Sequence, residues 1–238
     1  MSDFVPSAFL RPLSRILERA LPAAPASTQE ECYSQEGEDL IAARLLGEKL
    51  NGGFYVDVGA HHPTRHSNTY LFYRHGWRGI NIDATPGSMM EFRRVRPRDI
   101  NIECLVASDS SPRRFYVFNE QALNTASGEL ARKRPIENAQ YHIDGEVELQ
   151  PRKLASLLDE FLPIDQTIDL MSIDVEGLDF DVLRSNNWSR YRPTLLLVEL
   201  LHTELVDIDS HEISRFLLDQ GYRPIAKLYN TVIFRNIA

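Results

Sequence analysis

The feature that most constrains this chain is a series of short strand-like segments that are apolar on both faces, separated by segments with helical periodicity. Strands buried on both faces are typical of a parallel sheet, because crossover helices cover both of its sides. The expected strands are 54–58, 79–82, 102–107, 168–173 and 194–199, and the expected helices between them are 89–95, 154–162 and 180–184. The sequence therefore predicts an α/β fold with helices on both faces of the sheet.

The C-terminal part of the chain predicts a different ending for this sheet. Residues 222–228 and 231–235 flank Tyr229 and Asn230, which is typical of an antiparallel hairpin. Between the third and fourth expected strands lies a polar insertion, about residues 109–152, with two strand-like segments of its own. We therefore expect parallel strands closed by an antiparallel pair, with one large insertion.

Composition limits the classes of function. The 238 residues are 43% hydrophobic and 25% charged, as in an ordinary globular chain. The 34 acidic and 26 basic residues give a formal net charge of −8, which disfavours a nucleic-acid-binding role. Cys32 and Cys104 lie too far apart for a paired-cysteine zinc site. Since no apolar run can span a bilayer and no secretion signal begins the chain, we expect a cytoplasmic protein.

The N-terminal segment predicts a separate element. Residues 7–21 place apolar side chains on one face of an amphipathic helix, and a linker rich in proline and alanine follows. We expect residues 1–32 to be an appendage of a domain that spans residues 33–238. The apolar face can dock on that domain, on a second copy in a homo-oligomer, or peripherally on the inner surface of a membrane.

Acidic residues end the first two expected strands, where ligands of open α/β sheets bind. Asp57 can accept hydrogen bonds from a cationic amine, and Gly59 permits a tight turn next to a ligand. Asp83 can accept both hydroxyls of a ribose. His61 and His62 stand where a dinucleotide site needs glycines, so NAD is not expected. The pattern predicts a nucleoside ligand, and the alternative is that these acids only cap local backbone.

Five motifs occur in order along residues 33–235. They are YSQEGED at 33–39, DVGAHHP at 57–63, SNT at 67–69, GWRGINIDA at 76–84 and DVEG at 174–177. The set resembles the FkbM family of S-adenosylmethionine-dependent methyltransferases. The resemblance implies the Rossmann-like class I methyltransferase fold, a seven-stranded, mostly parallel sheet with an antiparallel C-terminal strand.

The resemblance also implies roles for single residues. The first loop would hold the methionine part of S-adenosylmethionine, Asp83 the ribose, and the turn after the third strand the adenine. The cofactor-binding residues implied in this way are Gln35, Asp57, Gly59, Ala60, Asn68, Asp83, Ala84, Ser108 and Asp109. The insertion is expected to shape the acceptor pocket, with Asn124 as a substrate-contacting residue.

The fourth and fifth strands end in candidates for the chemistry. Methyl transfer to an alcohol needs a base that removes the hydroxyl proton, or a divalent cation that lowers the pKa of the hydroxyl. Asp174, Glu176 and His202 are the catalytic candidates. Asp174, Glu199 and His202 are the candidate ligands of Mg²⁺ or Mn²⁺. Alternatively, Glu176 orients backbone amides of its turn, and His202 is an ordinary histidine beside a helix.

Two further groups of side chains can meet the acceptor. His61 and His62 can contact substrate or simply pack their loop. The arginines at 93, 94, 96 and 98 and the basic run 132–134 can meet an anionic acceptor, although such runs are usually solvated.

The sequence thus predicts an O-methyltransferase that acts on a sugar hydroxyl of a cell-surface glycan, its precursor or a glycosylated metabolite. The acceptor class depends on the family resemblance. The alternatives are an N-methyltransferase of a small molecule and a non-catalytic scaffold that binds a nucleoside.

Overall fold

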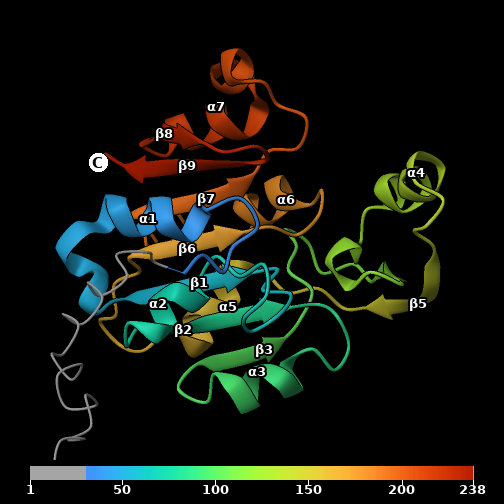
Figure 1. The fold of residues 1–238 in the computed structure, drawn as a ribbon, viewed down its shortest axis with the longest axis horizontal. Helices are drawn as coiled ribbons and strands as arrows, with labels where there is room; N and C mark the ends of the chain where they lie inside the picture. Colours follow the sequence, from blue (N-terminus) through green and yellow to red (C-terminus); the bar gives the residue numbers. More distant parts are fainter. Residues whose placement is uncertain (1–30, 238) are drawn as a thin grey trace, which may run out of the picture. The chain divides into compact units, whose positions relative to one another are not determined.

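Seven strands form one sheet in the order β3-β2-β1-β6-β7-β9-β8 (Figure 1). The computed structural model describes residues 31–237. The first five strands in this order, β3, β2, β1, β6 and β7, run parallel to one another. Strand β9 runs antiparallel to both of its neighbours. The strands are β1 (Phe54–Val58), β2 (Arg78–Asp83), β3 (Ile100–Glu103), β6 (Leu170–Ile173), β7 (Leu195–Glu199), β8 (Tyr222–Lys227) and β9 (Thr231–Asn236). The class I methyltransferase topology expected from the sequence is confirmed.

Helices cover both faces of the sheet, as predicted. On one face Ala42 and Leu71 pack against Leu170 and Leu197, and on the other Leu157, Val182 and Leu217 belong to a second buried cluster. The first group of helices is α1 (Glu38–Leu46), η2 (Gly47–Asn51) and α2 (Tyr70–Arg74), and α3 (Met89–Val95) follows β2. The second group is α5 (Leu154–Phe161), α6 (Asp179–Arg184), η4 (Leu205–Ser210) and α7 (Glu212–Asp219).

Burial on both faces explains the apolar strands. All five residues of β1 and all five of β7 are buried. Each of these strands includes one acid near its carboxyl end, Asp57 in β1 and Glu199 in β7. Because an acid so placed must find hydrogen bonds, a counter-charge or a proton, the same packing that forms the sheet creates a polar site at its edge.

The third strand is shorter than predicted. It was expected at 102–107, whereas β3 spans Ile100–Glu103. The N–H of Cys104 still donates to Asp83 O of β2 at 2.9 Å. Beyond Cys104 the chain exchanges backbone hydrogen bonds with Arg152, whose N–H donates to Leu105 O at 2.9 Å and whose carbonyl accepts from Ala107 N at 3.0 Å. Since β3 is an edge strand that pairs only with β2, the chain can leave the sheet there without breaking a second ladder.

The insertion forms a small sheet of its own beside the carboxyl ends of the main strands (Figure 1). Its strands β4 (Arg113–Phe118) and β5 (Ile143–Leu149) pair antiparallel. Between them lie η3 (Gln121–Leu123) and α4 (Gly128–Glu137). Both predicted strands of the insertion are therefore present.

The predicted amphipathic helix at 7–21 and most of the predicted appendage 1–32 lie outside the described residues. Between residues 31 and 237, none of the helices combines the length and the apolar character needed to cross a membrane.

Candidate functional site

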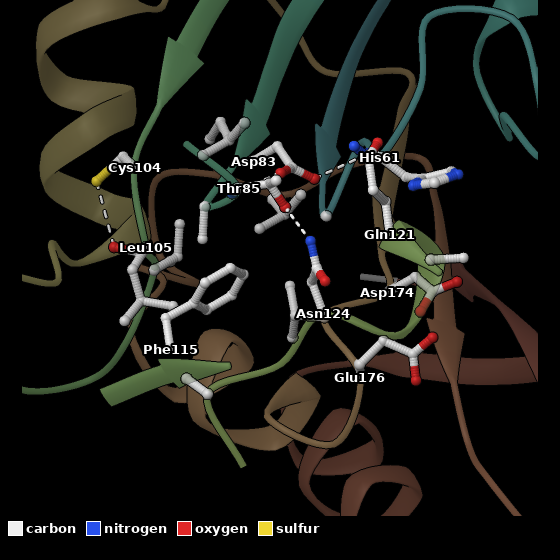
Figure 2. Close-up of a pocket in the computed structure, with 18 residues that line it drawn as sticks. His61, Asp83, Thr85, Cys104, Leu105, Phe115, Gln121, Asn124, Asp174 and Glu176 are labelled. Atoms are coloured by element: carbon white, nitrogen blue, oxygen red, sulfur yellow. Dashed lines mark hydrogen bonds between the residues drawn. The ribbon is translucent and has the colours of Figure 1, made fainter. Parts of the chain in front are cut away.

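The carboxyl ends of β1, β2 and β6 surround a cavity that is open to solvent (Figure 2). Leu105 and Phe115 line one side of it, and Asp174 and Glu176 line the other. Asp83 lies between these two groups in the view. The cavity is therefore apolar at one end and acidic at the other, which suits a ligand with a flat apolar part and a cationic part.

A second cavity adjoins the first. Both are lined by Gly59, His61, Ala122, Asp174 and Glu176. The second cavity is further lined by Gln35, Asp57, Ala60, His66, Asn68 and Ser172. The cofactor residues predicted from the N-terminal motifs therefore line two adjoining cavities, with Asp83 and Ala84 in the first and the others in the second.

Backbone N–H groups hold the carboxylate of Asp83 in place. The N–H of His61 donates to Oδ2 at 2.8 Å, and the N–H of Thr85 donates to Oδ1 at 2.8 Å. Burial raises the pKa of Asp83, and these hydrogen bonds oppose the rise. Because each carboxylate oxygen can accept more than one hydrogen bond, Asp83 can still accept a pair of hydroxyls from a ligand.

A buried arginine supports Asp57. Thr69 Oγ1 donates to Asp57 Oδ2 at 2.6 Å, and the fully buried Arg96 donates to Thr69 Oγ1 at 2.8 Å. Arg96 also donates to Ser67 Oγ at 2.6 Å and to Pro63 O at 2.7 Å, which ties down the loop after β1. Burial raises the pKa of Asp57 to about 6. Arg96, one of the four arginines expected to be solvated or to meet an anionic acceptor, is thus buried and stabilises this loop.

Gly59 is required by the neighbouring strand. Its φ is +82°, and a Cβ on it would lie 1.7 Å from the carbonyl oxygen of Asp174. The close approach that was expected toward a ligand is therefore an approach of two backbones, the turn after β1 and the end of β6. This contact fixes the distance between the two halves of the site.

The YSQEGED motif places Gln35 at the rim of the second cavity. Both carboxylate oxygens of Glu36 accept from the backbone N–H of Asn230, at 3.2 and 2.9 Å. Asp39 accepts from Tyr33 N at 2.7 Å and from Ser34 Oγ at 2.7 Å. The motif is thereby tied to the hairpin between β8 and β9 and to its own helix. Farther into the cavity, Asn68 donates to Ser172 Oγ at 3.0 Å.

Three carboxylates meet at the ends of β6 and β7. One oxygen from each of Asp174, Glu176 and Glu199 lies within 4.8 Å of the other two. Burial raises the pKa of all three, and the neighbouring carboxylates add to the rise for Asp174 and Glu199. At least one proton or one cation is therefore needed for these groups to coexist.

Asp179 organises the turn that carries two of these acids. Its Oδ1 accepts from Val175 N at 3.1 Å and its Oδ2 from Gly177 N at 3.2 Å. The orienting role that was the alternative for Glu176 therefore belongs to Asp179, which lies outside all five motifs. Glu176 has a φ of +56°, a conformation that costs about 1–3 kcal/mol and is held here by the surrounding contacts.

The insertion contacts this turn through two side chains. Arg134 of α4 forms an ion pair with Glu176 Oε2, and Thr125 Oγ1 donates to the backbone oxygen of Glu176 at 2.7 Å. The side chain of Arg134 is only 11% exposed. The basic run 132–134 was interpreted as a solvated or anion-binding face, but its third member belongs to the acidic site. Only the tertiary structure shows this, because 42 residues separate the two partners.

His202 lies apart from this cluster. It is exposed, has a φ of +56° in the turn after β7, and does not line either cavity. The predicted metal set of Asp174, Glu199 and His202 is corrected by the structure, which brings Glu176 to the two strand-end acids in its place.

The predicted substrate residues take different positions. His61 lines both cavities, and burial lowers its pKa to about 4, so it is neutral near pH 7. His62 lines neither of them; its Nδ1 accepts from Arg65 N at 2.9 Å and packs the loop. Asn124 lines the first cavity, where it accepts from Phe118 N at 2.8 Å and donates to Thr85 Oγ1 at 3.0 Å.

Ser108 and Asp109 lie away from the cavities. Ser108 donates to Asp181, and the exposed Asp109 pairs with Arg113 at 2.8 Å. Because β3 ends early, Cys104 and Leu105 line the site instead. The two residues predicted to contact the adenine therefore do not line either cavity, whereas Cys104 and Leu105, four positions earlier in the chain, line the first. Phe115 of the insertion, which faces Leu105, carried no sequence signal beyond its place in a predicted strand.

Comparison with known proteins shows that the chain matches one protein family. Residues 57–224, well over half of the chain, match the sequence profile described as the methyltransferase FkbM domain. Among solved structures, a Pyrococcus horikoshii protein described as a putative RNA methyltransferase is similar over 85% of this chain and 84% of its own, with 11% sequence identity and a TM-score of 0.44. None of the curated proteins compared with the chain matches it.

Proposed function

The chain belongs to the FkbM methyltransferase family, and on that basis we propose that it transfers the methyl group of S-adenosylmethionine to a hydroxyl oxygen. The observation that carries the proposal is the pair of adjoining cavities at the strand ends, with an apolar wall, a central carboxylate and an acidic end. The acceptor that we propose is a sugar hydroxyl of a cell-surface glycan, its precursor or a glycosylated metabolite.

The cavity residues fit this cofactor. Leu105 and Phe115 offer apolar surface for the adenine, and Asp83 offers oxygens for the ribose hydroxyls. The cofactor carries a positive sulfonium and a positive ammonium group, so Asp57 and Asp174 complement its charge in the second cavity. Neutral His61, between the two cavities, adds no opposing charge.

An oxygen acceptor is supported by the acidic end of the site. When bound, S-adenosylmethionine supplies the methyl group: its bond to sulfur breaks with both electrons left on sulfur while a bond to the acceptor oxygen forms. Asp174, next to both cavities, can take the proton that the hydroxyl loses. An amine attacks through its lone pair and has less need of such a base.

The test of this function begins with calorimetric titration of the full chain with S-adenosylmethionine and with S-adenosylhomocysteine. We expect saturable binding of both. Transfer of a labelled methyl group to a panel of saccharides then identifies the acceptor class, with small amines as the comparison. Absence of binding of both ligands would contradict the proposal and favour the scaffold alternative.

Asp83→Ala should weaken S-adenosylmethionine binding by about 10- to 100-fold, because hydrogen bonds to a charged group contribute about 1.5–3 kcal/mol. Turnover at saturating cofactor should change far less. The measurement is calorimetric affinity together with initial rates. Glu103→Ala is the matched control, since Glu103 ends the next strand but does not line the cavity. Equal affinities of the Asp83 variant and the wild type would overturn the ribose assignment.

Affinity for S-adenosylmethionine should fall as the pH drops below about 6. The pKa of Asp57 is raised to about 6 in the free protein by burial, and a cationic ammonium binds the ionised carboxylate. Affinity should therefore be constant above this pH and decline by at most about tenfold per unit below it. Titrations between pH 5 and 7.5 test this, and Asp57→Asn should give a flatter profile with weaker binding. A wild-type affinity that does not vary with pH would refute the role of Asp57.

A further inference from the structure

The acidic cluster contains one carboxylate oxygen that its surroundings do not satisfy. Glu199 is 9% exposed, and its Oε2 finds no hydrogen-bond partner within residues 31–237. Its side chain projects from the end of β7 toward Asp174 and Glu176, with one oxygen of each within 4.8 Å of the others. A buried carboxylate that has an unpartnered oxygen and lies beside two other carboxylates is unfavourable unless a cation or protons lie between them.

Charge balance indicates which cation suits this position. If all three carboxylates are ionised they carry three negative charges, and Arg134, paired with Glu176, neutralises one of them. A divalent cation would neutralise the remaining two. Hard divalent cations bind oxygen ligands, and oxygens held less than 5 Å apart can coordinate one ion after small side-chain shifts.

From these observations we propose that Asp174, Glu176 and Glu199 form a binding site for a divalent cation of the Mg²⁺ or Mn²⁺ class. The site deepens the proposed function, because a cation here would lower the pKa of an acceptor hydroxyl next to the acidic end of the cavity. Its existence is nevertheless measurable without any methyl transfer. Glu199 acts only as a ligand of this site, since it does not line either cavity.

The test is direct binding of Mn²⁺ to the full chain, freed of metal by a chelator and then dialysed, measured by electron paramagnetic resonance without cofactor. We expect one saturable site with a dissociation constant below about 1 mM, the weak end of protein sites for such ions. Mg²⁺ should compete for it. Absence of saturable Mn²⁺ binding would overturn the proposal and leave the cluster as acids that hold protons.

Glu199→Gln should weaken Mn²⁺ binding by at least about tenfold, because it removes a charged ligand and preserves the shape of the side chain. It also removes a buried charge without a hydrogen-bond partner on one oxygen, so its melting temperature in chelator should not fall. Glu146→Gln, at an exposed position of strand β5, is the matched control and should bind Mn²⁺ as the wild type does. If Glu199→Gln does not fold, Glu176→Gln makes the same test. Binding unchanged by either variant would place the ion elsewhere and refute the site.

Cofactor binding separates the two proposals. S-adenosylmethionine titrated in the presence of chelator reports on the proposed methyltransferase cavity alone. Binding of cofactor without any binding of Mn²⁺ would remove only the cation site, and binding of Mn²⁺ without cofactor would remove only the proposed function.

Discussion

Asp174→Asn should lower the rate of methyl transfer by about 10²- to 10⁴-fold, which is the usual contribution of a positioned acid or base. Asp174 follows β6, lines both cavities and lies within the acidic cluster, so its carboxylate adjoins the place where a hydroxyl must lose its proton. The amide of asparagine cannot take that proton. Cofactor affinity should change by less than about tenfold, because other residues make most of the contacts expected with the ligand.

The measurement is the turnover number at saturating cofactor together with the calorimetric dissociation constant. Asp144→Asn, an exposed position on β5, should retain the wild-type values and serves as the matched control. A variant that loses cofactor affinity but keeps its turnover would show that Asp174 binds cofactor and does not act on the acceptor.

Gly59→Ala should destabilise the fold by about 2–6 kcal/mol and abolish cofactor binding. The added Cβ meets the Asp174 carbonyl oxygen at 1.7 Å, and the φ of +82° is unfavourable for alanine. Backbone strain of this kind costs about 1–3 kcal/mol, and overpacking against a rigid neighbour adds about 1–3 kcal/mol more. Moving the turn to relieve the collision would displace both Asp57 and Asp174 from the second cavity.

Gly76→Ala is a closely matched control. Gly76 has a φ of +87°, but an added Cβ there meets no atom within 4 Å. It therefore experiences the backbone strain without the collision and should lose only about 1–3 kcal/mol. Urea unfolding of the two variants measures the difference. Equal losses would show that the contact between the β1 turn and Asp174 is not what makes glycine necessary at position 59.

The sequence determined the architecture because hydrophobic periodicity is a local property. Residues 54–58 are apolar on both faces, and a strand of this kind is stable only between two layers of helices. Residues 195–199 show the same pattern. The parallel sheet, its antiparallel ending and the insertion were all predictable from such local patterns. The edge strand β3 was predicted less well, because its end depends on a backbone pairing with Arg152, outside the sheet.

The motifs also indicated the two halves of the site, since Asp57 and Asp83 end neighbouring strands and Asp174 ends the next one in the sheet. In parallel sheets these ends share one edge, so a binding site there follows from the topology. Family resemblance then supplied the cofactor hypothesis, which the composition of the cavity supports but which the strand pattern alone would not have specified.

Only the tertiary structure decided which side chains meet. Arg134 reaches Glu176 across 42 residues, Phe115 reaches the apolar wall from the insertion, and Glu176 replaces His202 in the acidic cluster. Such partners depend on where loops of unrelated sequence return to the sheet, and no local pattern encodes that position. The positions of the buried strands follow from hydrophobic periodicity, which the sequence specifies locally, whereas the charge balance of the site depends on long-range packing.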